Sequence, residues 1–152
     1  EKVSGNLNTN TMVVFSGLVS ETKMWSRQEI LPNPYVMRCC YDCGSSISSG
    51  CLYMGDFDAR SEKNYQSLVD SYKNLWGQIG IIQLPHHGSE SNFNVDLLTK
   101  SAFFVISAGY KNKYRHPHVK VLKELILHKR LFAWVTEDVG SIMQSLITIK
   151  CY

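Results

Sequence analysis

Short apolar runs, bounded by turn-forming residues, divide the chain into predicted strands. The clearest is the run from Phe103 to Ser107, because phenylalanine, valine and isoleucine follow one another there without a polar break. Similar runs predict further strands at residues 11–16, 35–40, 51–54, 80–84, 131–136 and 141–151. The intervening stretch of residues 17–33 is mixed and polar, and a turn is marked by Pro32-Asn33-Pro34.

A helical period of apolar residues replaces the strand pattern in three segments. Helices are predicted at residues 61–76, 94–100 and 117–128. Ser61 can cap the first helix and Gly77 can end it, whereas Pro117 suits the first turn of the third. The apolar face of the first helix would consist of Tyr65, Leu68, Val69, Tyr72 and Leu75 or Trp76.

Strands that alternate with helices indicate α/β layering, and the two hairpin-like strands at the start add an antiparallel or mixed part. A chain of 152 residues suits one domain, or part of a larger one, and is long enough to bury a core. Neither an internal repeat nor a low-complexity segment interrupts the pattern. The sequence therefore predicts a single α/β domain over residues 1–152.

Two adjacent histidines follow the predicted strand at residues 80–84. Pro85 ends the strand because it has no N–H to donate, and His86, His87, Gly88 and Ser89 come next. Ligands and metals usually bind just beyond the ends of strands in α/β proteins, and imidazole is a common nitrogen ligand for zinc. The histidines could equally be structural or merely exposed, while Ser89 could cap the next element or bind a phosphate oxygen.

Asp56 stands in a similar position, because it follows the short apolar strand at residues 51–54 and the flexible Gly55. A glycine there permits a tight turn, so the carboxylate could reach a metal. The alternative for Asp56 is a turn or helix-capping aspartate. Asp58 is a weaker copy of the same pattern and is interpreted as an acid in the first turn of the helix.

His116 and His118 flank Pro117, which restricts the backbone between them. The spacing is common among metal ligands when the segment is extended, but a helix starting at Pro117 would allow only one ring to point inward. We favour His116 for a role in chemistry, and capped, solvated imidazoles are the alternative for the pair. His128 lies late in the third predicted helix, where a cation suits the helix dipole, and is interpreted as structural.

The segment before His116 is basic and interleaved with aromatic residues. Its residues are Tyr110, Lys111, Asn112, Lys113, Tyr114 and Arg115. Such a loop could hold a phosphodiester by charge and hydrogen bonding, and an ordinary solvated loop is the alternative.

The five cysteines point away from a secreted disulfide scaffold, because their number is odd and four of them lie between Cys39 and Cys51. Cys40 and Cys43 form a CxxC pair, but a second pair at zinc-binding spacing is missing. Free thiols are the main interpretation, and a small cysteine-zinc module is the alternative. A reducing compartment, and hence a cytoplasmic location, is expected.

Composition limits the functional classes further. The net charge of +3 is mildly basic, which permits a polyanionic substrate but does not mark a dedicated nucleic-acid binder. No apolar run is long enough to span a bilayer, and the first residues lack the layout of a signal peptide. Because the sequence begins abruptly without Met, we expect it to be a fragment or a processed piece.

Taken in order, these motifs resemble the second half of a metallo-β-lactamase-fold domain, specifically its ComEC-like branch. That branch includes the extracellular domain of a DNA-uptake channel protein and stand-alone hydrolases, so the extracellular face is the alternative location. The resemblance runs from about Thr11 to Ile149. It rests on Gly55-Asp56, on His86-His87-Gly88-Ser89, on Ile106-Ser107-Ala108-Gly109, on Asn112-Lys113-Tyr114-Arg115-His116-Pro117, and on Thr136 and Gly140.

The resemblance implies an αββα sandwich that binds one or two metal ions, usually zinc or manganese, at its edge. Asp56 would then correspond to the metal-bridging aspartate, and His86 and His87 to a metal ligand and its neighbour in an order left open. His116 would correspond to a histidine near the substrate. Asp56 and His116 would be the catalytic residues. Ser89, Asn112, Lys113, His116 and His118 would contact the substrate.

One part of the family pattern is missing from this chain. The first ligand motif, His-X-His-X-Asp-His, would precede Thr11, and the only His-X-His here is centred on Pro117. The chain is thus expected to be a partial domain with an insertion at about residues 18–50. A metal would lack most of its ligands, and the N-terminal half or another subunit would be needed as a partner.

Two functions of different classes follow from the sequence. The first is a metal-dependent hydrolase that cleaves a phosphodiester, as in nucleic acid, or a small phosphoester. The second is a degenerate or half domain that acts as a non-catalytic partner in an assembly.

Overall fold

The computed structural model describes residues 11–17, 24–30, 48 and 50–151. Five strands form one sheet in the order β1-β3-β4-β5-β6, in which β1 is antiparallel to β3 and the other neighbours are parallel. The strands are β1 (Val14–Ser16), β3 (Gly50–Tyr53), β4 (Ile79–Gln83), β5 (Phe103–Ser107) and β6 (Phe132–Val135). The predicted α/β class is therefore confirmed in its coarse form, a mixed sheet with helices.

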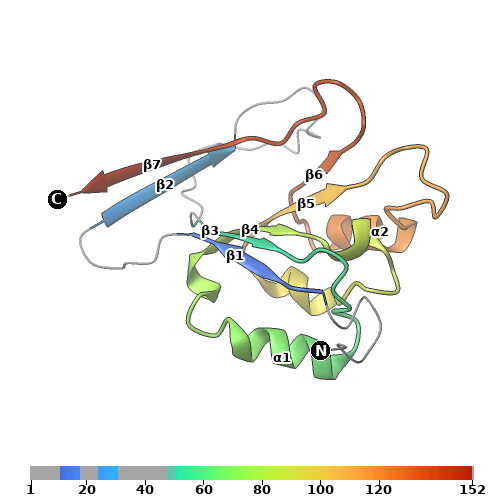
Figure 1. Ribbon diagram of the computed structural model, residues 1–152, viewed down its shortest axis with the longest axis horizontal. Helices are drawn as coiled ribbons and strands as arrows, with labels where there is room; N and C mark the ends of the chain where they lie inside the picture. The colour runs from blue at the N-terminus through green and yellow to red at the C-terminus, as the bar shows by residue number, and fades with distance from the viewer. Residues whose placement is uncertain (1–10, 18–23, 31–47, 49, 152) are drawn as a thin grey trace, which may run out of the picture.

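Two further strands form a separate antiparallel pair, β2 (Met24–Ile30) with β7 (Ser145–Cys151). Figure 1 shows this ribbon projecting away from the five-stranded sheet. The prediction for residues 17–33 missed β2, because its polar residues carry no continuous apolar signal. β2 forms its hydrogen bonds with β7, which lies far along the chain, since Met24 pairs with Cys151.

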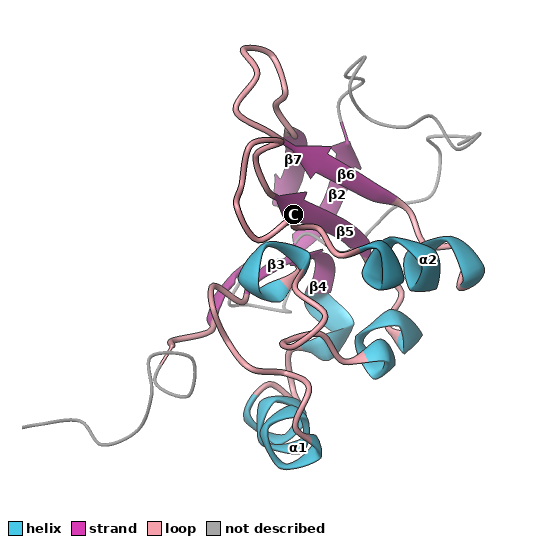
Figure 2. Cartoon of the chain, turned by 90° about the vertical axis from the view of Figure 1, so that its right-hand side faces the viewer, coloured by secondary structure: helices cyan, strands magenta, loops and turns pink. Residues whose placement is uncertain are grey.

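Both α-helices pack on one face of the five-stranded sheet, as Figures 1 and 2 show. One buried cluster joins Leu52, Ile82 and Phe104, which are aligned across three strands, to Leu68 of α1 and Leu125 of α2. The helical segments are α1 (Glu62–Ser71), α2 (Val119–Leu127) and the short 3₁₀ turns η1 (Trp76–Gln78), η2 (Pro85–Gly88) and η3 (Val95–Thr99). Among the described residues, no helix has the length and apolar character of a membrane span.

The opposite face of the sheet carries a second, smaller apolar cluster. Ile81, Phe103 and Ala133 form its buried centre, with Val105 and Met143 packed against it. Strands with both faces covered read as continuous apolar runs, which explains why β4 and β5 are the plainest signals in the sequence.

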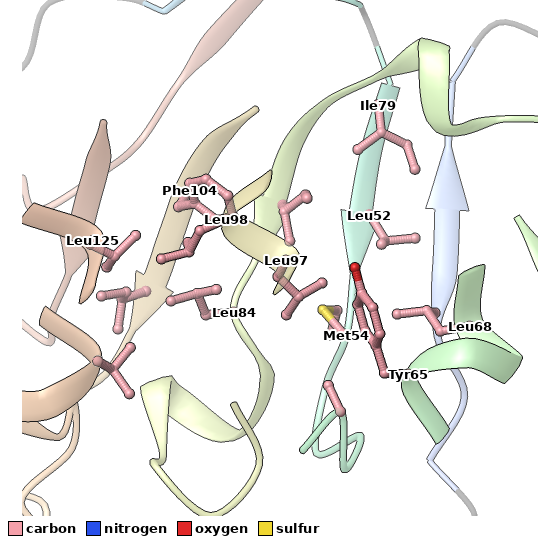
Figure 3. Packing of buried hydrophobic residues seen from close by; sticks show 14 of the residues in the cluster. Leu52, Met54, Tyr65, Leu68, Ile79, Leu84, Leu97, Leu98, Phe104 and Leu125 are labelled. Carbon is pink, nitrogen blue, oxygen red and sulfur yellow. The ribbon is translucent and has the colours of Figure 1, made fainter. Parts of the chain in front are cut away.

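Figure 3 shows side chains of the main cluster. Leu84, Leu97, Leu98 and Phe104 meet between the sheet and the helical layer, and the side chains of all four are almost fully buried. Each such side chain contributes about 1.5–3 kcal/mol of hydrophobic free energy relative to an exposed one. This packing fixes the strands whose carboxyl ends carry the histidines.

Helix ends are where the predictions were least accurate. Ser61 caps α1 as expected, since its hydroxyl accepts from Asn64 N–H at 3.3 Å. The helix ends at Ser71, well before Gly77, and Tyr72 turns its hydroxyl to the carbonyl of Val13 at 2.6 Å. Pro117 precedes α2 rather than opening it, so its predicted place in the first turn was wrong.

The predicted strand at residues 35–40 lies outside the described residues.

Candidate active site

Three loops that follow neighbouring parallel strands meet at one edge of the sheet. They follow β3, β4 and β5, and their residues are 54–59, 84–89 and 108–118. Backbone hydrogen bonds join them: His86 N–H donates to the carbonyl oxygen of Gly55 at 2.7 Å, and His118 N–H donates to that of Gly88 at 3.0 Å. Most sequence-predicted site residues therefore lie on adjoining loops, as expected for strand ends in a parallel sheet.

The two histidines after β4 adopt an unusual backbone conformation. His86 has φ 45° and ψ 52°, His87 has φ 57° and ψ 23°, and Gly88 continues with φ 77°. A left-handed conformation costs a residue other than glycine about 1–2 kcal/mol, so two in succession need support from the surroundings. The bond from His86 N–H to Gly55 supplies part of that support. Such strain is typical of functional sites.

His87 is held in one tautomer by its neighbour. Its Nδ1 lies 2.6 Å from the carbonyl oxygen of Ser107, which can only accept a hydrogen bond. Nδ1 therefore carries the hydrogen, and in the neutral form of the ring Nε2 has the lone pair. An exposed imidazole oriented in this way can ligate a metal or accept a proton through Nε2.

The rings of His86 and His116 come together from different loops. Their centroids are 5.6 Å apart, and the centroids of His86 and His87 are 6.0 Å apart. The Nδ1 atoms of His86 and His116 are both buried and have no hydrogen-bond partner among the described residues. Buried polar atoms normally find partners, so these two nitrogens are candidates for contact with a ligand.

The charge state of His116 follows from the same crowding. Burial lowers the pKa of His116 below its ordinary value of 6.5, and charges on His86, His87 and His118 lower it further. At neutral pH the ring is consequently neutral, which is the form that ligates metals and accepts protons.

Asn112 fixes the backbone around His116. Its Oδ1 accepts from His116 N–H at 2.7 Å, and its Nδ2 donates to the carbonyl oxygen of His116 at 2.7 Å and also to that of Gly109. The side chain was predicted to contact the substrate, but its amide is engaged by the loop itself. We assign Asn112 to positioning His116, and a substrate contact stays an untested prediction.

Ser89 and His118 are likewise engaged within the protein. Ser89 is only 4% exposed, and its hydroxyl lies 2.8 Å from that of Ser91. His118 caps α2, with Nδ1 3.4 Å from Lys120 N and 3.2 Å from a carboxylate oxygen of Glu90. The predicted substrate contacts of Ser89 and His118 stay predictions, and their hydrogen bonds here are structural.

The two aspartates after β3 differ in their surroundings. Asp58 accepts a hydrogen bond from Arg60 N–H at 3.1 Å and precedes α1, so its predicted place in the first turn of the helix was wrong. Asp56 is exposed on the turn made by Gly55, whose φ is 50°. Its backbone carbonyl accepts from Nδ2 of the buried Asn92 at 3.4 Å, which anchors the turn to the loop after Ser89. The sequence contained no signal for this role of Asn92.

The described residues do not form a complete metal site by themselves. Among residues 11–17, 24–30, 48 and 50–151, no group of three or more histidine, cysteine, aspartate or glutamate side chains could hold a metal ion. The two orphaned nitrogens suit a metal, but a protein zinc site normally has three or four protein ligands. His86, His87, His116 and Asp56 thus supply at most part of a ligand set.

Most of the cysteine cluster lies outside the residues that the structure describes. Cys39, Cys40 and Cys43 lie outside the described residues. Cys51 is a free, half-buried thiol at the start of β3, and burial raises its pKa. A thiol with a raised pKa is a poor nucleophile, which agrees with a packing role.

Comparison with known proteins gives one partial similarity. The chain is 33% identical over 81 residues to ComE operon protein 3 of Bacillus subtilis (strain 168), a match that covers 51% of this chain and 10% of that protein. No protein-family model matches the chain, and no solved structure matches it. The similarity supports a relation to ComE-type proteins, whereas the metallo-β-lactamase fold stays a prediction.

Proposed function

We propose that the chain forms the carboxyl-terminal part of an αββα metallo-β-lactamase-type domain whose activity is metal-dependent hydrolysis of a phosphodiester or phosphoester. The observation that carries the proposal is the pair of buried, unpartnered Nδ1 atoms on His86 and His116, whose rings meet 5.6 Å apart at the carboxyl ends of parallel strands. The partial similarity to ComE operon protein 3 agrees with the family named by the motifs.

Asp56, His86 and His87 are the proposed metal ligands, and zinc is the favoured metal, with manganese as the alternative. His87 offers Nε2 because Ser107 holds its Nδ1–H, while His86 offers its unpartnered Nδ1. The remaining ligands would come from a His-X-His-X-Asp-His motif on another segment or subunit, since the described set is incomplete. A divalent metal in such a site supplies a nucleophile by activating water near neutral pH.

Two further residues would act on the substrate directly. His116 is neutral at pH 7 because burial lowers its pKa, so it can accept a proton from the attacking group or hydrogen-bond a phosphoryl oxygen. Lys113 lies on the same exposed loop and carries an ammonium group that can neutralise phosphoryl charge.

The test measures zinc and manganese by mass spectrometry in the complete gene product, together with hydrolysis of bis(p-nitrophenyl) phosphate. We expect about one to two metal ions per chain, and loss of both metal and activity in Asp56→Ala. Asp58→Ala is the matched control: its carboxylate caps a turn two residues away, so metal and activity should be retained. Metal-free gene product, or metal that survives Asp56→Ala and His86→Ala, would contradict the proposal.

A second candidate function is a non-catalytic binding partner in an assembly. It is favoured by the finding that the described residues hold no group of three potential metal ligands. Under this alternative the gene product binds no stoichiometric metal and hydrolyses no phosphodiester, yet the loops after β4 and β5 still bind their partner. The same metal analysis therefore separates the two candidates.

A further inference from the structure

We propose that Glu137 is a positioning residue for His116 and acts through the backbone of the loop that carries His116. That loop follows β5 and comprises residues 108–118, whereas Glu137 lies in the turn that follows the neighbouring strand β6. Nothing in the sequence pattern connects this glutamate with the candidate site. The inference rests on the proposed function for its effect on catalysis, but the contacts that carry it belong to the chain itself.

The Glu137 carboxylate holds the backbone at the start of the loop. Tyr110 N–H donates to Glu137 Oε2 at 2.8 Å. Backbone N–H groups of Glu137 itself, of Tyr110 and of Lys111 hold the pKa of Glu137 below its ordinary value of 4.5, and the positive charge of Lys111 adds to the effect. The carboxylate is therefore ionised at neutral pH, and a hydrogen bond to an ionised group is roughly twice as strong as one between neutral groups.

Gly109 allows the carboxylate to approach the loop this closely. A Cβ at Gly109 would lie 2.6 Å from Oε2 and 3.1 Å from Cδ of Glu137, and the three heavy atoms nearest to that Cβ all belong to Glu137. At such a distance one of the two groups has to move. Because the carboxylate ends a flexible side chain, a methyl group at Gly109 would displace it from the loop.

Glu137 is itself part of a closed turn. Thr136 N–H donates to the hydroxyl of the buried Ser141 at 2.9 Å, and Ser141 N–H donates to the carbonyl oxygen of Asp138 at 2.9 Å. Asp138 N–H donates to Thr136 Oγ1 at 3.3 Å. The turn directly continues β6, so the acceptor for the loop is fixed relative to the sheet. Support of this kind from outside a site is what holds its side chains in place.

The part of the loop that Glu137 holds leads directly to His116. The carbonyl oxygen of Gly109 accepts from Asn112 Nδ2, and the same amide is bonded to the N–H and the carbonyl oxygen of His116 at 2.7 Å each. Because one amide joins Gly109 to His116, a shift of the loop start changes the position of His116. The His116 ring would then leave its place 5.6 Å from that of His86.

The first experiment records the NMR signals of the His116 ring and of the Asn112 side-chain amide in the full chain in EDTA. We expect Glu137→Ala to shift or broaden both, because the loop loses the carboxylate. Glu137→Gln should keep most of the natural signals, since its amide oxygen can still accept from Tyr110 N–H. Asp138→Ala is the matched control: it removes the same charge from the next residue, which bonds within the turn through its backbone, and should leave both signals unchanged.

A double-mutant cycle tests whether Gly109 and Glu137 affect His116 through their mutual contact. Gly109→Ala should displace the carboxylate and reproduce the His116 signals of Glu137→Ala. In the Glu137→Ala background the added methyl group meets no carboxylate, so the double variant should show no larger change than Glu137→Ala alone. Additive changes would mean that Gly109 acts by another route and would contradict the proposal.

The second experiment uses the complete gene product and bis(p-nitrophenyl) phosphate. Glu137→Ala should lower kcat about tenfold or more, because a misplaced proton acceptor contributes less to the reaction. KM should stay within about twofold of its natural value. Metal content should be unchanged, since the proposed ligands Asp56, His86 and His87 lie on other loops. A parallel loss of metal would connect Glu137 with the metal rather than with His116 and would overturn the proposal.

The two experiments separate the positioning role from the proposed hydrolase. Altered His116 signals in Glu137→Ala, together with a gene product that hydrolyses no phosphodiester, would support the positioning role and contradict only the hydrolase. Hydrolysis with an unchanged kcat in Glu137→Ala, or unchanged His116 signals, would contradict the positioning role. If Glu137→Ala fails to fold, Gly109→Ala decides: His116 signals like those of the natural chain would then overturn the proposal.

Discussion

The carbonyl oxygen of Gly88 accepts a hydrogen bond from His118 N–H at 3.0 Å. This single bond joins the loop that carries His86 and His87 to the loop that carries His116. It forms where Gly88 lies against Pro117, and the closeness of that approach sets the distance between the two histidine loops.

Substituting Gly88 should disturb both loops. Its φ is 77°, and an added Cβ would come within 2.9 Å of Pro117 Cβ and 3.4 Å of Ile106 Cγ2. We expect Gly88→Ala to lower the free energy of unfolding by about 1–3 kcal/mol in urea denaturation, from backbone strain and overpacking. Gly77→Ala is the control, because a Cβ there meets nothing within 4 Å, and its stability should be unchanged or slightly raised. Equal destabilisation of the two variants would contradict the packing argument.

Removing the Asn112 amide should loosen His116. Asn112→Ala loses three hydrogen bonds to the backbone of the loop and leaves part-buried groups unpaired. We expect a loss of about 1–3 kcal/mol in unfolding free energy, and the NMR signals of the His116 ring should broaden or shift. Asn112→Asp keeps the acceptor for His116 N–H and loses both donors, so an intermediate loss is expected. A stable variant with an unchanged His116 signal would show that the amide is not what positions the ring.

His116 should make the fold sensitive to mild acid. Burial, and then the neighbouring histidines, hold its pKa below 6.5 in the folded chain, so the unfolded chain binds more protons as the pH falls through that value. Stability should consequently decrease as the pH falls through about 6.5, and this decrease should level off below the folded pKa. Urea denaturation in EDTA between pH 8 and pH 5 should show a shallower decrease for His116→Gln than for the natural chain. An NMR titration midpoint for His116 above 6.5 would contradict the assignment.

Two leucines on α2 provide a sharp test of the core. Leu125 is 0% exposed and packs against the sheet, whereas Leu127 is 62% exposed on the same helix. Leu125→Ala should cost about 2–5 kcal/mol of unfolding free energy, because it removes buried methyl groups and leaves a cavity. Leu127→Ala should change stability by about 0.5 kcal/mol or less. Similar losses of stability in both variants would mean that α2 is rotated about its own axis, so that it buries a different face against the sheet.

Residues that act through long-range contacts could not be found from the sequence. Trp134 lies in β6 and Glu137 follows that strand, and neither gave a local signal, because both reach the loop of residues 108–115 only when β5 and β6 lie side by side. The bonds between the Asn112 amide and its own loop were not predicted, because they depend on how the loop closes. Strand β2 was missed because its ladder is formed with β7 at the other end of the chain.

The sequence by itself determined the strands of the main sheet and the place of the histidines beyond β4 and β5. Apolar runs and Pro85 act locally, since a strand with both faces buried needs continuous apolar side chains and proline ends its ladder. Only the tertiary structure decided which imidazole nitrogens are engaged and which are left unpartnered. That distinction depends on carbonyls and rings brought together across the sheet, as when Ser107 takes Nδ1 of His87 while Nδ1 of His86 and His116 find no partner among the described residues.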